Sequence, residues 1–314
     1  MTKKIPIILD GDPGHDDAIA WVLANADPNL DILAVTTVSG NQTIEKTSYN
    51  AQRICTLIGL DVPIGKGGST PLIREPMNAP SVHGDSGLDG PALPEPAFPL
   101  SDLSAVELIA EKVRECKDKV TLVPTGPLTN IAAFLLAHPE LKNRIEQISL
   151  MGGGIELGNW TPAAEFNILV DPEAADIVFR SGIPIIMSGL DVTEKAFIKP
   201  EDVELIRSHH NEVAQIVAQW LEFFYEFHLN LGYEGAPVHD AVAVTALTHP
   251  EWMDIRELYV EVETKGKYCV GATVGDIHRV TGKAPNTKVL MGIHRENFVN
   301  YIARACGSYG EVKA

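Results

Sequence analysis

Asp10-Gly11-Asp12-Pro13-Gly14-His15-Asp16-Asp17 is the stretch around which we expect the fold to be organised. Residues 5–9 before it form an apolar run that predicts a strand, and residues 18–23 after it begin a helical pattern. One strand-to-helix turn therefore carries four carboxylates. Because ligands of open α/β sheets bind beyond the carboxyl ends of the strands, the sequence predicts that these acids lie at the functional site.

Four carboxylates held this close repel one another unless some are protonated or a cation joins them. Calcium takes roughly six to eight oxygen ligands and magnesium prefers octahedral oxygen, so either ion suits aspartates better than zinc does. A plainer interpretation is a solvated helix N-terminus, where the helix dipole favours the negative charge of Asp16 and Asp17. That interpretation leaves Asp10 and Asp12 unexplained, so the turn favours a hard divalent cation.

Length and composition favour one large α/β domain. With 314 residues, 45% of them hydrophobic, the chain can bury a sizeable core, and we expect residues 1–314 to form a single domain. The 42 acidic and 25 basic residues give a net charge of −17, which argues against a nucleic-acid partner and against an anionic membrane surface. The four cysteines include no C-x-x-C pair, so neither a disulfide framework nor a zinc site is expected.

The N-terminal residues lack the features of a targeting segment. Met1-Thr2-Lys3-Lys4 runs directly into the first predicted strand, without the apolar core of a signal peptide. The chain also has no apolar run of about 18 residues, the length that a membrane-spanning helix needs. We therefore expect a soluble protein of the cytoplasm.

Strand and helix patterns alternate along most of the chain. Apolar runs at residues 30–38, 120–124, 148–151 and 183–187 predict strands, and helical patterns begin near residues 44, 104 and 171. This alternation predicts an α/β fold with a mainly parallel, open sheet that helices flank on both faces.

The C-terminal part is expected to add one long helix and a few further elements. Residues 211–231 predict the longest helix, whose apolar stripe is typical of a core-facing surface. The stripe consists of Val213, Ile216, Val217, Trp220, Leu221, Phe224 and Leu231. Strands are expected at residues 258–263 and 268–274, and a last helix near residues 296–306.

Other polar residues stand where strands or loops end. Asn41 follows the second predicted strand, a position that suits an ordinary turn as well as a ligand contact. His83 lies in a proline- and glycine-rich stretch, residues 65–100, and so long a loop in a compact domain is usually functional or mobile. His239-Asp240 opens a further helix, where the pair could also be an accident of helix capping.

Seven motifs, taken in order, resemble the motif set of the inosine–uridine nucleoside hydrolases. The match runs from the first strand to beyond residue 290. The motifs are Asp10-Gly11-Asp12-Pro13-Gly14-His15-Asp16-Asp17-Ala18, Gly40-Asn41-Gln42-Thr43, His83-Gly84-Asp85-Ser86-Gly87, Val123-Pro124-Thr125-Gly126-Pro127-Leu128-Thr129-Asn130, Met151-Gly152-Gly153-Gly154, Glu165-Phe166-Asn167 and Val238-His239-Asp240.

The resemblance implies a Rossmann-like core and an N-ribosyl hydrolase that splits a ribonucleoside into ribose and free base around a bound calcium ion. It further implies nucleoside salvage as the setting and a homo-oligomer, a dimer or tetramer, as the assembly. Carried onto this sequence, the calcium ligands are Asp12, Asp17, the Thr125 carbonyl and Asp240. The substrate-binding positions are Asp16, Asn41, Asn159, Glu165, Phe166 and Asn167, and the base-side histidines are His83 and His239. Residues 223–231, which would touch the base, leave purine or pyrimidine preference open.

The chemistry of N-glycosidic cleavage fits these residue types. The ribosyl group passes through an oxocarbenium-like state, so the site needs an activated water on one face and help for the leaving base on the other. Asp12 is our candidate for the carboxylate that takes the proton of the water. A histidine could donate a proton to the base, and His239, beside Asp240, is better placed in the sequence than His83.

Two other classes of protein remain open at this point. The Asp-x-Asp after the first strand also resembles haloacid-dehalogenase-type phosphatases, but Pro13 and Gly14 stand where that motif continues with glycine and threonine. A non-catalytic, calcium-dependent nucleoside-binding protein would use the same residues without turnover.

Overall fold

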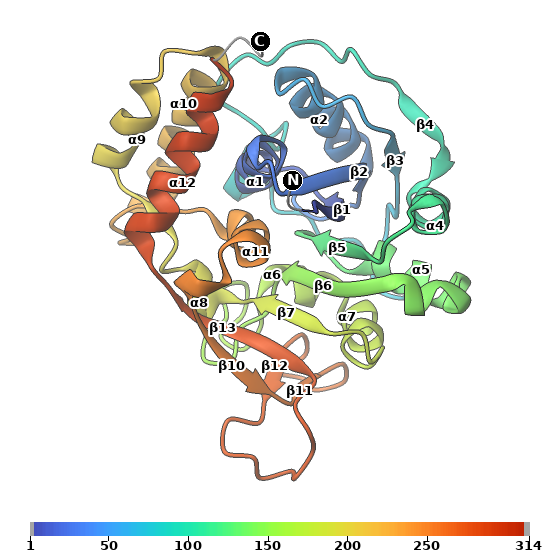
Figure 1. Cartoon of the computed structure of the whole chain (residues 1–314). Helices are drawn as coiled ribbons and strands as arrows, with labels where there is room; N and C mark the ends of the chain where they lie inside the picture. Colours follow the sequence, from blue (N-terminus) through green and yellow to red (C-terminus); the bar gives the residue numbers. More distant parts are fainter. Residues whose placement is uncertain (1–2, 311–314) are drawn as a thin grey trace.

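A computed structural model describes residues 3–310, and these fold around a nine-stranded sheet in the order β10-β13-β7-β6-β5-β1-β2-β3-β4 (Figure 1). Neighbouring strands pair in parallel throughout, except that β10 is antiparallel to β13. The strands are β1 (Ile5–Gly11), β2 (Leu30–Thr37), β3 (Ile64–Lys66), β4 (Leu100–Ser104), β5 (Val120–Pro124), β6 (Ile145–Met151), β7 (Ile185–Ser188), β10 (Met253–Leu258) and β13 (Thr287–Ile293). The expected mainly parallel sheet is confirmed.

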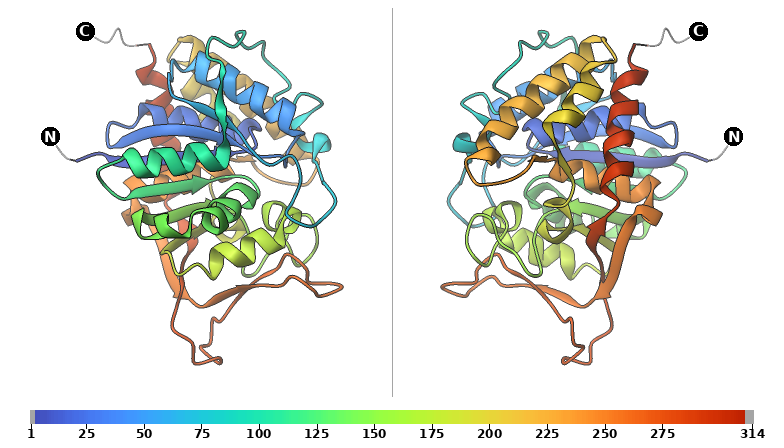
Figure 2. Two further views of the ribbon diagram at one scale, coloured as in Figure 1. Left: turned by 90° about the vertical axis from the view of Figure 1, so that its right-hand side faces the viewer. Right: turned by 90° about the vertical axis from the view of Figure 1, so that its left-hand side faces the viewer.

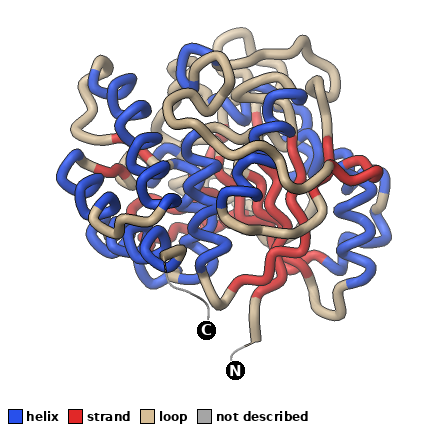
Figure 3. The backbone as a smooth tube through the Cα atoms, turned by 90° about the horizontal axis from the view of Figure 1, so that it is seen from above, coloured by secondary structure: helices blue, strands red, loops and turns tan. Residues whose placement is uncertain are grey.

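Helices cover both faces of this sheet, as Figure 3 shows with the strands in the middle. One face carries α1 (His15–Ala26), α2 (Ile44–Leu57) and α11 (His239–Thr248), and outside them lie α9 (Pro200–Arg207), α10 (Glu212–Leu229) and α12 (Arg295–Ser308). The other face carries α4 (Ala105–Glu115), α5 (Thr129–Ala137) and α7 (Pro172–Phe179). Short helices α3 (Pro80–His83), α6 (Phe166–Val170) and α8 (Leu190–Thr193) lie in the connections. Among residues 3–310 no helix is long and apolar enough to cross a membrane.

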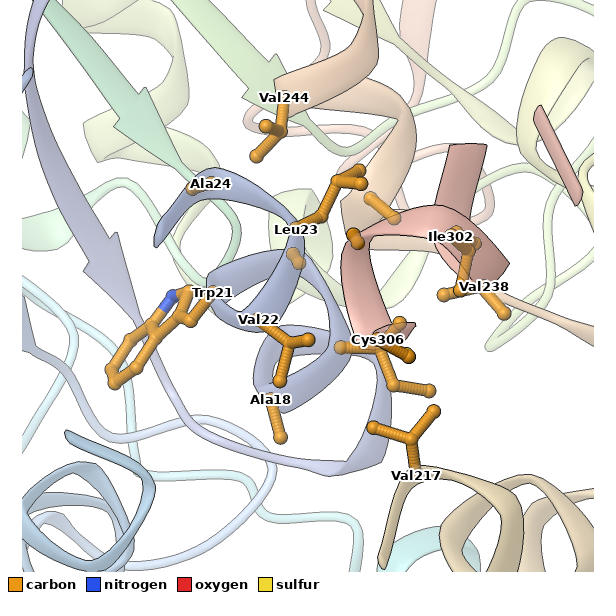
Figure 4. Close-up of a cluster of buried hydrophobic side chains, with 14 of the residues drawn as sticks. Ala18, Trp21, Val22, Leu23, Ala24, Val217, Val238, Val244, Ile302 and Cys306 are labelled. Atoms are coloured by element: carbon orange, nitrogen blue, oxygen red, sulfur yellow. The ribbon is translucent and has the colours of Figure 1, made fainter. Parts of the chain in front are cut away.

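Two hydrophobic clusters fill the space between the sheet and its helices. In β1, Ile7 and Leu9 belong to the cluster under α1, whereas Ile8 belongs to the cluster under α4 and α5, because successive strand residues point to opposite faces. Figure 4 shows α1 at the centre of the first cluster, where Leu23 and Val22 lie among side chains of α10, α11 and α12. Helix α1 is therefore buried on nearly all sides, which fixes the acidic turn that precedes and begins it.

The C-terminal part differs from the expectation. Residues 268–274 were expected to form a strand, but residues 268–271 form a turn with Gly271 at φ +82°, and only β12 (Thr273–Gly275) is extended. Strand β12 pairs with β11 (Val260–Val262) in a small separate sheet, which projects beyond the main sheet in Figure 2. The expectation also overlooked β10 and β13. Strand β10 is an edge strand with mostly exposed, alternating charged residues, so its apolar signal is weak.

The long helix α10 ends at Leu229, and β9 (Ala236–Pro237), which follows the loop after it, pairs with the earlier β8 (Phe197–Ile198) in a second small sheet. The prediction that the apolar stripe of this helix faces the core is therefore wrong for its last residue, Leu231. Phe224 is buried at 2% exposure, but Leu231 lies outside the helix and is 61% exposed.

The order of the strands in the sheet indicates at which edge of the sheet a ligand is expected to bind. From β1 the chain moves to β2 on one side, and it later returns to β5 on the other side of β1. Such a reversal leaves a crevice beyond the carboxyl ends of β1 and β5, and ligands of open α/β sheets bind there. The acidic turn after β1 and the segment from Thr125 after β5 both border this crevice.

Candidate active site

The acidic turn and the start of α11 converge at the crevice. Asp16 and Asp17 lie in the first turn of α1, and Asp240 lies in the first turn of α11. One carboxylate oxygen from each of these three residues lies within 4.8 Å of the others. Two helix N-termini therefore meet here, and their dipoles favour negative charge.

Asp12 is held from several sides and keeps one oxygen free of protein partners. Its Oδ2 accepts a hydrogen bond from the Asn41 backbone N–H at 2.6 Å, while its buried Oδ1 has no partner among the described residues. Gly126 passes so close that a Cβ there would lie 2.5 Å from Oδ1, and a Cβ on Gly40 would collide with Oδ2. The close approach of two glycines fixes the carboxylate without filling the space beside Oδ1.

Asp17 and Thr125 link the turn after β1 to the turn after β5. The Thr125 hydroxyl donates to Asp17 Oδ1 at 2.6 Å, and the Gly14 backbone N–H donates to Asp17 Oδ2 at 3.0 Å. The Thr125 carbonyl accepts from Asn167 Nδ2 at 2.8 Å. The four ligands that the resemblance implied for calcium thus lie in one region of the structure.

Asp10 differs from the other acids of the turn. Its Oδ1 accepts from the Thr36 hydroxyl and from Asn130 Nδ2, both at 2.7 Å, so the side chain ties β1 to β2 and to α5. Burial raises the pKa of Asp10 to about 7. Asp10 is thus the next-to-last residue of β1 and links three elements, although its buried Oδ2 has no partner among the described residues.

The residues that face the crevice suit a hard cation. Burial and the neighbouring carboxylates raise the pKa of Asp12 and of Asp240, because each negative charge disfavours the next. Within residues 3–310, the pocket lining contains no lysine or arginine to balance them. Buried oxygens of Asp12 and Asp16 have no partner among the described residues. Calcium and magnesium bind through oxygen atoms, and these buried carboxylate oxygens are available for such an ion.

One pocket brings most of the predicted site residues together. Its lining includes Asp16, Asn41, His83, Thr125, Asn159, Glu165, Phe166, Asn167, His239 and Asp240. Asp12 and Asp17 are not part of that lining; they lie behind Asn41 and Thr125, to which they are hydrogen-bonded. Of the predicted metal ligands, Thr125 and Asp240 thus line the pocket, where they form an acidic floor together with Asp16, and Asp12 and Asp17 lie directly behind it.

A polar wall is built around Glu165 at the start of α6. Its Oε1 accepts from the Asn167 N–H at 2.9 Å and its Oε2 accepts from the Gly153 N–H at 2.8 Å. Burial raises the pKa of Glu165 to about 7 against the lowering effect of these hydrogen bonds. Asn159 Oδ1 accepts from the Phe166 N–H at 3.0 Å, so the loop before α6 is fixed to the same wall.

The opposite wall is aromatic and carries three histidines. His83, at the end of α3, stacks on Phe224 with ring centroids 5.3 Å apart. His228 donates from Nδ1 to the Phe224 carbonyl at 2.8 Å, because a carbonyl can only accept. Burial lowers the pKa of His239 to about 3 and that of His83 well below its ordinary value, so both rings are neutral.

The sequence did not single out three further residues at the pocket. Tyr233 donates its hydroxyl to Glu194 Oε1 at 3.0 Å, and both side chains line the pocket. The Thr193 hydroxyl lies 2.8 Å from His239 Nδ1. Thr193 and Glu194 lie shortly after the carboxyl end of β7, so the rule that located Asn41 could have found them. Tyr233 follows an irregular loop and gave no signal.

Comparison with known proteins assigns this combination of sheet, acidic turn and pocket to a family. The family model of the inosine-uridine preferring nucleoside hydrolases matches residues 7–300, and the chain belongs to this family. The resemblance seen in the motifs is thereby confirmed. The phosphatase interpretation of Asp10 and Asp12 is not retained.

Curated and structural relatives agree with this assignment. The pyrimidine-specific ribonucleoside hydrolase RihA of Photobacterium profundum is 54% identical over 307 residues, which are 97% of this chain and 99% of the relative. RihA of Escherichia coli O139:H28 is 53% identical over 302 residues, 95% of this chain and 97% of the relative. The solved purine-preferring ribonucleoside hydrolase from Gardnerella vaginalis superposes with a TM-score of 0.90 at 31% identity, covering 97% of this chain and 99% of that one. The chain is a ribonucleoside hydrolase, an N-ribosyl hydrolase.

Proposed function

We propose that this protein hydrolyses the N-glycosidic bond of pyrimidine ribonucleosides with the help of calcium, releasing ribose and the free base for nucleoside salvage. The observation that carries the proposal is the pocket itself, in which an acidic floor, a polar wall and a histidine wall meet. The pyrimidine preference rests on the names of the relatives that are more than half identical to this chain. A homo-oligomeric state, dimer or tetramer, is part of the same proposal.

Calcium is the proposed cation because the floor offers only oxygen atoms. Asp12, Asp17, Asp240 and the Thr125 carbonyl would hold it, and the carboxylates that lie within 4.8 Å of one another are those of Asp16, Asp17 and Asp240. When bound, calcium would balance the carboxylates and make a neighbouring water more acidic. This choice is supported by the buried Asp12 Oδ1, which has no protein partner within the described residues.

Asp12 is the proposed general base. Its Oδ1 is free to accept a proton from the attacking water, while the hydrogen bond from Asn41 holds the rest of the carboxylate in place. Proton removal by a positioned carboxylate contributes about 10²–10⁴ in rate. As the water attacks, the electrons of the glycosidic bond leave with the base.

The polar wall is proposed to bind ribose. Asp16, Asn41, Asn159, Glu165 and Asn167 all line the pocket and offer carboxylate and amide groups to hydroxyls, with the Phe166 ring beside them. Fixing the sugar hydroxyls positions the anomeric carbon, and the carboxylates of Asp16 and Glu165 stabilise the positive charge that develops on the ribosyl group. On the opposite wall, His239 and His83 are proposed to assist the leaving base.

A panel of nucleosides tests this proposal. Uridine, cytidine, inosine and adenosine are incubated with the purified protein, and free ribose and free base are both measured. We expect release from uridine and cytidine with a kcat/KM at least about tenfold above that for inosine and adenosine, since such a ratio needs only about 1.4 kcal/mol of difference in transition-state binding. Faster cleavage of inosine would overturn the pyrimidine preference alone, and negligible release from all four would overturn the proposed reaction.

A further inference from the structure

The segment between β6 and α6 carries the polar wall of the pocket, although it contributes no helix or strand of its own. Gly153 and Asn159 lie in this segment, and their hydrogen bonds to Glu165 and Phe166 hold the wall together. Buried backbone groups outside helices and sheets need hydrogen-bond partners from elsewhere in the protein. The position of the wall therefore depends on the elements that supply those partners.

Thr273, the first residue of β12, is one such partner. Its hydroxyl accepts a hydrogen bond from the Gly154 N–H at 2.9 Å and donates one to the Gly154 carbonyl at 2.8 Å. Both residues are buried, and among the described residues these two backbone groups have no other hydrogen-bond partner. One hydroxyl thus satisfies both, because it is a donor and an acceptor at once. A side chain without a hydroxyl would leave both groups unpaired, which is unfavourable.

The contact with Thr273 reaches Glu165 through Gly153. A Cβ on Gly153 would lie 2.7 Å from the Thr273 hydroxyl oxygen, and Gly153 has φ +74°, so only glycine fits this close approach. The Gly153 N–H donates to Glu165 Oε2 at 2.8 Å. Thr273 is therefore separated from the carboxylate of the polar wall by two residues, both of which it contacts or binds.

A second anchor holds the part of the segment that follows. The two carboxylate oxygens of Asp191, on α8, accept from the N–H groups of Ile155 at 2.7 Å and Glu156 at 2.9 Å. Asp191 does not bind Gly154, and Thr273 does not bind residues 155 and 156. The two anchors thus hold different parts of the segment, and neither replaces the other.

The small sheet β11–β12 packs directly on the segment that Thr273 holds. Thr273 is buried while Val274 is exposed, since successive strand residues face opposite sides. A Cβ on Gly275 would lie 2.8 Å from the Ile155 side chain, and one on Gly271 would lie 2.9 Å from Leu169 Cα in α6. The sheet that projects beyond the main sheet in Figure 2 therefore has an inner side that rests against the pocket wall.

We propose that Thr273 is a positioning residue for the polar wall, and that the small sheet is thereby a working part of the active site. Thr273 is not in the pocket lining and acts only through Gly154 and Gly153 on Glu165. A displacement of about 1 Å in a group that places the substrate can lower the rate about a hundredfold. The inference rests on the proposed binding of ribose by this wall.

Kinetics of Thr273 variants test the role. Thr273→Val and Thr273→Ala both lack the hydroxyl, one with and one without the side-chain volume, whereas Thr273→Ser retains it. We expect both hydroxyl-free variants to lower kcat/KM for uridine at least about tenfold, mostly in kcat, because contacts to the sugar hydroxyls strengthen in the transition state. Thr273→Ser should stay within about threefold of the wild type. A hydroxyl-free variant as active as the wild type would contradict the role.

A matched control separates positioning from a loss of packing. Thr287, the first residue of β13, is equally buried at 3% exposure, and its hydroxyl donates to Asn286 Oδ1 at 3.1 Å. It lies at the amino ends of the strands, opposite the crevice, because it pairs with Ile185, the first residue of β7. Thr287→Val should therefore leave kcat/KM for uridine within about threefold. A loss equal to that of Thr273→Val would mean that any buried hydroxyl has this effect.

Substrates that lack one sugar hydroxyl test whether the effect passes through the wall. The loss of kcat/KM caused by Thr273→Val is measured on uridine and on 2′-, 3′- and 5′-deoxyuridine. Two changes that remove the same interaction are not additive. We expect the loss to shrink to less than about threefold for at least one deoxyuridine, the one without the hydroxyl that the wall holds. An equal loss on all four substrates would contradict a route through the ribose-binding wall.

Amide hydrogen exchange tests the anchor without turnover. We expect the N–H groups of Gly153 and Gly154 to exchange at least about tenfold faster in Thr273→Val and at the wild-type rate in Thr273→Ser, with unchanged exchange in β1 as evidence of an intact fold. Faster exchange at Gly154 alone, or at neither glycine, would overturn the proposal. Failure of the proposed function is distinguishable, because it would appear as a wild-type protein that does not cleave uridine, whereas the exchange result is independent of cleavage.

Discussion

Asp10, in the last part of β1, and Asp12, directly after that strand, stand two residues apart, yet they have different partners. Asp10 Oδ1 receives hydrogen bonds from Thr36 and Asn130, whereas its buried Oδ2, like Oδ1 of Asp12, has no partner among the described residues. Asp12 lies behind the pocket lining, between two close glycines, and its buried Oδ1 has no partner among the described residues. The sequence could locate the acidic turn, because four acids after a strand are unusual. It could not divide the acids into structural and functional ones, since that depends on partners from β2 and α5.

Replacing Asp12 should abolish most activity without unfolding the protein. Asp12→Asn keeps the shape but removes the proposed base and one charge of the cation site, so we expect kcat on uridine to fall at least about a thousandfold. Asp10→Asn is the matched control, and it should stay within about tenfold because Oδ1 still accepts both of its hydrogen bonds. Circular dichroism checks the fold of each variant. An Asp12→Asn enzyme within tenfold of the wild type would assign the base to another residue.

Glu165 should make the metal-free protein less stable as the pH rises. Its pKa in the folded chain is raised to about 7 from an ordinary value of 4.5, so the folded state holds the proton more tightly than the unfolded state does. The free energy of unfolding is therefore undiminished below about pH 4.5, falls as the pH rises toward 7, and is then lower by roughly 3 kcal/mol.

Glu165→Gln cannot ionise and should flatten this decline. The measurement is urea unfolding in the presence of a chelator across this pH range. An equal slope for both proteins would show that Glu165 titrates normally. The Asn167 and Gly153 N–H groups donate to different oxygens of Glu165, and a glutamine side chain offers only one oxygen. The substitution therefore loses part of these buried hydrogen bonds, and the comparison uses the slope and not the absolute stability.

At the scale of single elements, a helix or strand could be predicted from the sequence where its local pattern was strong, and it was overlooked where the pattern was weak. The helix expected near Ser104 exists as α4, and the Ser104 hydroxyl accepts from the Glu107 N–H at 3.3 Å. Edge strand β10 was overlooked because its exposed charged residues conceal the strand period. The pocket wall at Glu194 and Tyr233, with Thr193 against His239, was overlooked because it is assembled from the end of α8 and a loop, which no local pattern connects.

Two helix caps of different connectivity should differ in their contribution to stability. Asp171 caps α7 through the Ala174 N–H at 3.1 Å and also accepts from the Leu72 N–H at 2.9 Å and the Thr129 hydroxyl at 2.7 Å. Ser104 caps α4 through one bond only. We expect Asp171→Ala to cost about 2–3 kcal/mol and Ser104→Ala about 1 kcal/mol in urea unfolding, with kcat changed by less than about threefold in both. Equal costs would mean that the bonds between elements contribute nothing beyond the cap.

At the scale of the whole molecule, negative charge is concentrated where the two central helices begin. Helices α1 and α11 pack against each other and bring Asp16, Asp17 and Asp240 into contact. The chain as a whole carries a net charge of −17, so no distant excess of positive charge relieves this repulsion. The parallel sheet could be predicted from the alternation of strands and helices, and so could its functional edge. The packing of α11 beside α1 could not, because the two helices are far apart in the sequence and only the order of the strands brings them together.

Calcium should therefore stabilise the folded protein. A cation that binds only the folded state adds about 2.7 kcal/mol when it is present at a hundredfold excess over its Kd. We expect the melting temperature to rise with added calcium and to fall after chelation, with a larger calcium effect at higher pH, where more of the carboxylates are ionised. Asp240→Asn should lose most of this increase. A melting temperature that is independent of calcium at every pH would contradict the proposed site.

The most direct test of the central claim is the rate of ribose release from uridine as calcium is returned to the chelated enzyme. If the acidic floor holds the ion that activity needs, the chelated protein is inactive, and turnover returns in proportion to calcium until about one ion per chain is bound. The Asp12→Asn enzyme, titrated in parallel, should stay at least about a thousandfold slower at saturating calcium. Full turnover of the wild type after exhaustive chelation, or equal turnover by the two proteins at saturation, would contradict the account.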